Sequence, residues 1–266
     1  MHSEIIGDGA PDLCVVSCLH GDETGGREAA RSVLNDHDRD PTVQYIEANQ
    51  EAVEEGVRYI DTDLNRAFPG DRSGDAHERR LAAAILKAVR APVIDLHTTP
   101  STDQPFCVIA GDGPQTPTFC RATGLERVID IGYESGGLIQ HVPGISVECG
   151  RRGTDKAVEN GVAILQNVLD ACSDGGAVPA SDPEVYRITG EIERREDMQF
   201  LRQDFEPVAE GEVFATAGGE EIIAEEPFYP VLTATDGYED RLGYTAERAG
   251  TLSEYKTVRE QGGHHG

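Results

Sequence analysis

The first two thirds of the chain alternate short apolar runs with segments of helical periodicity. The apolar runs predict strands at Asp12–Leu19, Thr42–Glu47, Pro92–Leu96, Phe106–Ala110, Arg127–Ile131 and Gly144–Glu148. Helices are predicted at Thr24–Asn35, Asp75–Val89 and Thr116–Thr123, and another from the spacing of Val158, Val162, Leu165, Leu169 and Cys172. This alternation favours an α/β fold, with a mainly parallel mixed sheet that has helices on both faces.

A change in composition follows the last of these helices. Residues 176–182 lie in a stretch of Gly, Pro and Ser, and we interpret them as a linker. It would join an α/β domain of residues 1–175 to a small C-terminal β domain of residues 183–260. The predicted strands of the second domain are short: Val185–Glu193, Gly211–Ala215, Glu221–Ala224 and Tyr229–Ala234.

The charge of the chain narrows the range of partners. Asp and Glu number 49 against 23 Lys and Arg, which gives a formal net charge of −26. A nucleic-acid-binding protein needs a basic face, so we expect no nucleic acid partner. The recurring apolar residues argue against disorder. We interpret the charge as an acidic surface adapted to high salt, and we expect a halophilic source, an archaeon.

The sequence also predicts where the protein works. It has no apolar run long enough for a transmembrane helix and no signal-peptide pattern, so we expect neither a membrane span nor a membrane partner. Its six cysteines form no CxxC pair, which favours free thiols in a reducing cytoplasm. The oligomeric state stays open, with a homo-oligomer as one option.

Three potential metal ligands follow two predicted strands. His20 and Glu23 come after the first strand, and His97 comes after the strand that ends at Leu96. The carboxyl ends of parallel strands meet at one edge of a sheet, where sites commonly form. Two imidazoles and one carboxylate suit a catalytic zinc ion, which leaves one position for water. Co, Mn or Ni would suit the same residues.

Other polar residues are placed to assist such a metal. Glu148 ends an apolar strand and is the best candidate for the base that takes a proton from water. Asp95 lies two residues before His97, where a carboxylate often orients a ligating histidine. Arg58, and Asn65 with Arg66, lie in the loop between the two ligand segments, and arginine binds a carboxylate through two hydrogen bonds.

In this order, these motifs resemble the succinylglutamate desuccinylase/aspartoacylase family, which belongs to the zinc carboxypeptidase clan. The segments involved are His20–Glu23, Arg58–Asp61, Asp63–Arg66, Asp95–Thr98 and Glu148, with a weaker likeness at Phe228–Val231 and Tyr238–Glu239. The resemblance implies a zinc carboxypeptidase-like fold and one zinc ion per chain.

The family also implies a role for each residue. His20, Glu23 and His97 would bind zinc, and Glu148 would be the general acid and base. Arg58 would polarise the scissile carbonyl, Asn65 and Arg66 would bind a substrate carboxylate, and Tyr238 would reach the substrate from the C-terminal domain. Residues 136–140 lack the second substrate arginine that aspartoacylases have before the catalytic glutamate.

We therefore expect a zinc-dependent amidohydrolase that cleaves a small anionic substrate, an N-acyl amino acid or a related carboxylate. The sequence does not specify the acyl group or the amine. A carboxypeptidase that acts on peptides is the first alternative. A catalytically silent module that binds zinc or a ligand is the second, although such a module would need neither Glu148 nor Arg58.

Overall fold

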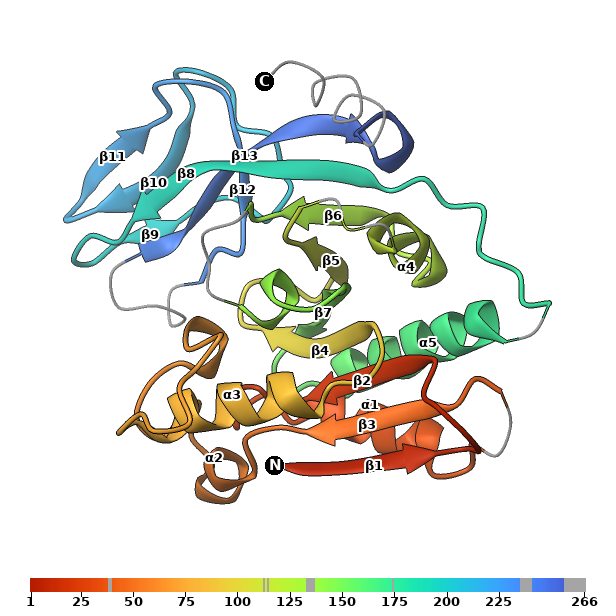
Figure 1. Cartoon of the computed structure of the whole chain (residues 1–266). Helices are drawn as coiled ribbons and strands as arrows, with labels where there is room; N and C mark the ends of the chain where they lie inside the picture. Colours follow the sequence, from red (N-terminus) through yellow and green to blue (C-terminus); the bar gives the residue numbers. More distant parts are fainter. Residues whose placement is uncertain are drawn as a thin grey trace, which may run out of the picture.

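The computed structural model describes residues 1–37, 40–111, 113, 115–132, 137–173, 175–234 and 241–255. Within these ranges ten strands form one sheet in the order β1-β3-β2-β4-β7-β5-β6-β8-β13-β12 (Figure 1). The strands are β1 (His2–Ile6), β2 (Leu13–Ser17), β3 (Val43–Glu47), β4 (Val93–Thr99), β5 (Phe106–Ile109), β6 (Arg127–Asp130), β7 (Gly144–Arg151), β8 (Glu184–Glu193), β12 (Tyr229–Val231) and β13 (Arg241–Thr251).

The labelled helices lie between these strands in the sequence. They are α1 (Gly25–Leu34), α2 (Gln50–Glu55), α3 (His77–Ala88), α4 (Thr116–Ala122) and α5 (Asp155–Cys172), with short 3₁₀ helices η1 (Leu64–Arg66) and η2 (Leu138–Gln140). Residues 252–255, after β13, are also helical. The pairs β2–β3, β2–β4, β4–β7, β5–β6 and β6–β8 are parallel, and the other pairs of the large sheet are antiparallel. The predicted α/β fold with a mixed sheet is therefore confirmed.

The core lies on both faces of the central strands. Leu13 and Val15 of β2 pack in a cluster with residues of α1, α4 and α5. Cys14 and Val16 point to the opposite face, into a second cluster that includes residues of α3. Every residue of β2 is buried, as expected for a central strand covered by helices on both sides. Complete burial of a leucine or valine contributes about 1.5–3 kcal/mol, so these clusters hold the strand ends in place.

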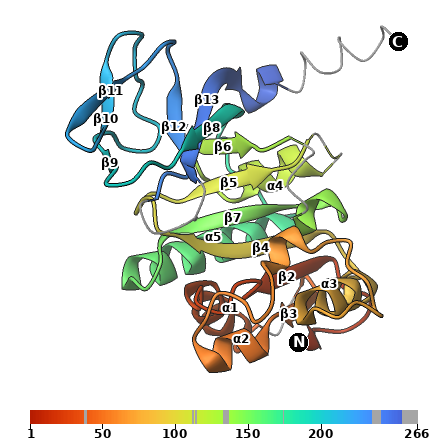
Figure 2. The same ribbon diagram turned by 90° about the vertical axis from the view of Figure 1, so that its left-hand side faces the viewer.

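The C-terminal part of the chain extends the same sheet. After residues 176–182, β8 pairs with β6 in parallel, and β13 and β12 follow it at the sheet edge. A separate three-stranded sheet contains β9 (Gln199–Phe200), β10 (Val213–Ala217) and β11 (Glu220–Ile223), and it projects beside β8 and β13 (Figure 2). The small C-terminal sheet thus exists, while the domain boundaries and the linker stay predictions.

Three strands were not predicted, for different physical reasons. β9 has only two residues, too few to show a period. β1 is an edge strand with mostly exposed residues, so its sequence lacks an apolar alternation. β13 is long, but its register with β8 shifts between Arg241 and Gly243, between Thr245 and Ala246, and between Arg248 and Thr251. Such shifts interrupt the two-residue period from which a strand is predicted. Helix α2 was also missed, because it is short and mostly exposed.

None of the helices in the described ranges is both long enough and apolar enough to cross a membrane.

Candidate active site

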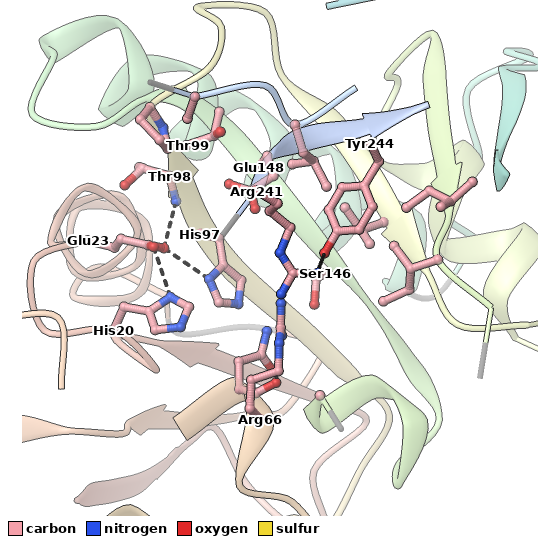
Figure 3. A pocket seen from close by; sticks show the side chains of 18 of the residues that line it. His20, Glu23, Arg66, His97, Thr98, Thr99, Ser146, Glu148, Arg241 and Tyr244 are labelled. Carbon is pink, nitrogen blue, oxygen red and sulfur yellow. Dashed lines mark hydrogen bonds and ion pairs between the residues drawn. The ribbon is translucent and has the colours of Figure 1, made fainter. Parts of the chain in front are cut away.

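Neighbouring strands bring the predicted ligands to one edge of the sheet. His20 follows β2, Glu23 lies just before α1, and His97 lies in β4. All three residues are at most 4% exposed. Their side chains point toward one another from these separate elements (Figure 3). Because β2, β4 and β7 are mutually parallel, their carboxyl ends lie together at this edge.

The loop between the two ligands of the first segment needs a glycine. A Cβ atom at Gly21 would lie 2.2 Å from the carbonyl carbon of Ala52 in α2. The Gly21 amide also donates to the Arg58 carbonyl at 3.0 Å. The loop therefore packs directly on α2 and beside Arg58, which fixes the position of His20 and Glu23.

The three side chains form a tight cluster around Glu23. Nδ1 of His20 lies 2.8 Å from Oε1 of Glu23, and Nδ1 of His97 lies 3.0 Å from Oε2. The backbone amide of Thr98 donates to the same Oε2 at 3.1 Å. One ligand atom from each of His20, Glu23 and His97 lies within 4.8 Å of the others, a spacing that fits a shared metal ion.

Two aspartates orient the imidazole rings. Nε2 of His97 lies 2.7 Å from Oδ2 of Asp95, and Nε2 of His20 lies 3.0 Å from Oδ1 of Asp63. When each Nε2–H donates to its aspartate, the lone pair of each Nδ1 faces Glu23. Lone pairs on nitrogen and carboxylate oxygen repel one another unless a cation lies between them. Nδ1 of His20 is moreover buried and accepts a hydrogen bond from no donor among the described residues. The donor set therefore fits a divalent metal ion.

The electrostatics of the cluster point the same way. Burial lowers the pKa of both imidazoles, but Glu23 beside His20 and Asp95 beside His97 outweigh it and raise each pKa. Burial also raises the pKa of Glu23, but the two histidines outweigh this effect and hold that pKa well below its usual value. The site thus favours added positive charge, which a metal ion supplies as well as protons do.

Glu148 lies beside the cluster. It is the register partner of His97 across the parallel pair β4–β7. Its Oε2 is buried and makes no hydrogen bond with the part of the chain that the structure describes. Removal of the carboxylate from water raises the pKa of Glu148 to about 7, and His97 opposes part of this increase. A carboxyl with a pKa near neutrality can both accept and return a proton.

Arg58 extends from its loop to the same cluster. Its Nη1 donates to Oε1 of Glu23 at 2.8 Å, and its Nη2 lies 3.0 Å from Nε2 of His20 and 3.4 Å from Oδ2 of Asp63. The structure therefore places the guanidinium next to the predicted metal ligands. Interaction with His20 and Arg58 also overcomes the effect of burial on Asp63 and lowers the pKa of that residue.

A buried glutamate in α3 holds the loop that follows Arg58. The carboxylate of Glu78 accepts hydrogen bonds from the backbone amides of Ile60, Asp61 and Thr62, at 2.7, 3.0 and 3.1 Å. It also accepts Nδ2 of Asn49 at 3.1 Å. Burial raises the pKa of Glu78, but these donors outweigh it and lower the pKa overall. Sequence analysis missed this residue, because an acidic residue in the first turn of a helix is common.

Asn65 and Arg66 lie in η1 and line the same pocket as the cluster. Oδ1 of Asn65 accepts the Leu138 amide at 3.1 Å, which joins η1 to η2. Its NH₂ group, a donor, is the part of the side chain that it can offer to a carboxylate. The structure thus brings together seven of the eight predicted site residues. Tyr238, the eighth, lies outside the described residues.

The pocket in front of the cluster has a volume of about 740 Å³. One wall comes from β8, β13 and the segment after β12, which sequence analysis did not connect with the site. This wall contains Ile188, Thr189, Gly190, Glu191, Leu232, Ala234, Arg241 and Tyr244. Local sequence patterns could not predict this wall, because it forms only when β8 pairs with β6 and β13 pairs with β8.

The fold and the buried polar cluster define a class of protein: an α/β protein with a candidate metal site at the carboxyl edge of a mixed sheet. Residues 9–132 match the model of the succinylglutamate desuccinylase/aspartoacylase catalytic domain. The resemblance predicted from the motifs is therefore confirmed: over these residues the chain is similar to the catalytic domain of that hydrolase family.

Whole-chain comparisons agree with this family. An N-acyl-aromatic-L-amino acid amidohydrolase (carboxylate-forming) of Xenopus tropicalis is 27% identical over 284 residues, covering 88% of this chain and 91% of the relative. The succinylglutamate desuccinylase of Shewanella denitrificans is 24% identical over 265 residues, covering 82% of this chain and 76% of the relative.

Solved structures show the same fold. A succinylglutamate desuccinylase/aspartoacylase from Rhodobacter sphaeroides superposes with a TM-score of 0.74 at 18% identity, covering 92% of this chain and 89% of the other. Murine aminoacylase 3 superposes with a TM-score of 0.72 at 19% identity, covering 91% and 96%.

Proposed function

We propose that this protein is a zinc-dependent amidohydrolase that cleaves the amide bond of an N-acyl amino acid. The products would be a carboxylic acid and an amino acid. The observation that supports this most strongly is the placement of Glu148 directly across from His97, beside the His20–Glu23–His97 cluster and facing a pocket. The relatives, an amidohydrolase and a desuccinylase, support the same class of reaction.

His20, Glu23 and His97 would hold one zinc ion per chain. When bound, the metal would polarise the scissile carbonyl and lower the pKa of water from 15.7 to about 7. Asp95 and Asp63 keep the two imidazoles oriented for this task by accepting their Nε2–H groups.

Glu148 would act as the general base and then as the general acid. The residue lines the pocket, where its carboxylate can meet a water molecule, and its Oε2 has no hydrogen-bond partner among the described residues. It would accept the proton as the water oxygen attacks the amide carbon. The same proton would then pass to the amine nitrogen, which cannot leave as an anion.

Arg58 would stabilise the negative charge that develops on the carbonyl oxygen. Its guanidinium already lies against Glu23 and His20, at the side of the cluster that faces the loop. A fixed donor aimed at a developing oxyanion is typically worth a factor of 10²–10³ in kcat, or about 2.7–4 kcal/mol.

The NH₂ group of Asn65 and the guanidinium of Arg66 would bind the carboxylate of the substrate. Both side chains line the pocket, and they follow one another in the single turn η1. Tyr238 remains part of the proposal as a further substrate contact. A small anionic substrate would therefore find a local basic region in a chain whose net charge is −26.

The shape of the pocket favours a small substrate over a peptide. The wall formed by β8 and β13 and the turn η1 line the same pocket, and Arg241 and Arg66 extend into it from opposite sides (Figure 3). An extended peptide would need an open groove instead. A silent binding module is also disfavoured, because a buried carboxylate oxygen without a hydrogen-bond partner, such as Oε2 of Glu148, is costly and is retained most readily where it has chemistry to perform.

The proposal is tested by a metal assay joined to a substrate screen. Purified protein should contain about one zinc ion per chain, and a panel of N-acetyl and N-succinyl amino acids should include a hydrolysed member. The Glu148→Ala variant should keep the metal and lose turnover. A folded, active preparation without metal would contradict zinc dependence, and metal-loaded protein that hydrolyses no member of the panel would contradict the deacylase assignment.

A further inference from the structure

Arg241 reaches the pocket from the far end of the chain. It is the first residue of β13, and it lines the same pocket as His20, Glu148 and Arg66. Its Nη1 lies 3.0 Å from the Tyr244 hydroxyl, and its guanidinium lies over the Tyr244 ring, 5.3 Å from the centroid. The same Nη1 donates to Glu191 of β8. Arg241 is thus held in a defined orientation.

Arg241 and Arg66 enter the pocket from opposite walls. Arg66 comes from η1 and Arg241 from β13, and Figure 3 shows their side chains extended toward each other. Two guanidinium groups that face one pocket repel each other, and an anion between them relieves the repulsion. A carboxylate is a suitable anion, because each of its oxygens can accept hydrogen bonds from a guanidinium.

The ion pair with Glu191 does not prevent Arg241 from binding a ligand. The Glu191 side chain is 54% exposed, whereas that of Arg241 is 20% exposed. An ion pair with a well-hydrated partner contributes little to stability, because water competes for the carboxylate. A substrate carboxylate inside the pocket is less hydrated and would compete effectively for the same guanidinium.

A purely structural role is the alternative. In that role Arg241 would only join β13 to β8, as other arginines of these strands do. Arg248, on the same strand, makes an ion pair with Glu184 of β8. Arg248 is not among the residues that line the pocket. It therefore offers a matched control for the loss of one arginine and one β8–β13 ion pair.

We propose that Arg241 is a substrate-binding residue that holds the substrate carboxylate together with Arg66, from the opposite wall of the pocket. This inference rests on the proposed function, because it assigns a second cation to the same N-acyl amino acid. It also gives the C-terminal part of the chain a direct role in specificity, because the enzyme would prefer N-acyl amino acids to the corresponding uncharged C-terminal amides.

The kinetic test compares Arg241→Gln with Arg248→Gln on the best substrate of the panel. Loss of a charged hydrogen-bond partner should raise KM about 10- to 100-fold for Arg241→Gln. The kcat value should change little, since the residue lies away from the reacting carbonyl. Arg248→Gln should resemble the wild type, and Arg241→Lys should recover part of the loss. Equal behaviour of Arg241→Gln and Arg248→Gln, with both folded by circular dichroism, would overturn the inference.

A double-mutant cycle tests whether the two arginines share one carboxylate. If they do, the KM effects of Arg66→Gln and Arg241→Gln should be strongly non-additive. Additive effects would mean that Arg241 contacts a different part of the substrate, and would overturn the proposed clamp.

A binding experiment separates this inference from the proposed reaction. N-acetyl amino acids and their C-terminal amides are titrated calorimetrically into Glu148→Ala protein, with and without Arg241→Gln. The acids should bind better than the amides, and Arg241→Gln should remove most of that preference. If the wild-type enzyme hydrolyses nothing yet this preference exists, the deacylase proposal fails and the Arg241 assignment stands. If no acid of the panel shows an Arg241-dependent preference, the assignment fails whatever the catalytic result.

Discussion

His97 and Glu148 face each other as register partners on the neighbouring parallel strands β4 and β7. Both residues lie within strands, so the pairing places a predicted metal ligand directly beside a predicted base, and neither is carried by a loop. Strands buried on both faces move little, so the distance between the two groups depends on the sheet rather than on a mobile segment. This rigidity suits a site in which a proton acceptor must stay close to the metal.

Asp95 should control metal affinity through His97. In Asp95→Asn the ring of His97 loses a charged hydrogen-bond acceptor, so its orientation and basicity as a ligand should both decrease. We expect zinc affinity to fall about 10- to 100-fold, with the fold retained. The zinc affinity is measured by competition with a fluorescent chelator. His2→Ala, which removes an exposed histidine of β1, should bind zinc like the wild type. Unchanged affinity in Asp95→Asn would contradict the orienting role.

The pH dependence of kcat/KM should show an acidic limb that belongs to Glu148. Burial raises the pKa of its carboxyl to about 7, and the base must be ionised to accept a proton. Activity should therefore be lost as the pH falls through this region and recovered as it rises. Because a bound cation favours the carboxylate, metal loading should move the limb to lower pH.

The Glu148→Gln variant identifies the group responsible for that limb. It should lose activity by about 10²–10⁴-fold and should show no titration in this range. Stopped assays on metal-loaded protein, with zinc measured in each sample, provide the comparison. A variant that keeps both its activity and its acidic limb would assign the limb to another group.

Glu78 should affect catalysis from outside the pocket. In Glu78→Gln one carboxylate oxygen becomes an NH₂ group, which would face either the Ile60 amide or the amides of Asp61 and Thr62. The loop should therefore shift and carry Arg58 with it. We expect a loss of about 1–3 kcal/mol in the free energy of unfolding and up to about 100-fold in kcat/KM, with zinc still bound. Urea unfolding and steady-state kinetics measure the two effects. Glu54→Gln, at an exposed position of α2, is the control and should leave both unchanged.

Salt should stabilise the folded chain. With a net charge of −26, the compact state repels itself when salt is low. The Debye length falls from about 10 Å at 0.1 M to about 3 Å at 1 M, so the midpoint of thermal unfolding should rise between these concentrations of KCl. Sucrose, which stabilises proteins without screening charge, should not reproduce the full increase. An unfolding midpoint that is independent of KCl would contradict adaptation to high salt.

The motifs of the site could be found from the sequence because they are local. His20 and Glu23 lie three residues apart, and His97 and Glu148 each end an apolar run, so strand prediction was enough to place them at one edge. The ring-orienting role of Asp95 followed from the two-residue period of a strand, which sets Asp95 and His97 on the same face of β4.

Contacts between distant parts of the chain appear only after folding. Glu78 meets the loop at Ile60, and Arg241 meets the pocket that contains Arg66, through pairings that no local pattern encodes. The bulges of β13 even hid that strand from prediction. The sequence thus determines the chemistry of the metal site, since ligand types and strand ends are local properties. The wall across from that site depends on which strands pair, and strand pairing is a property of the whole folded chain.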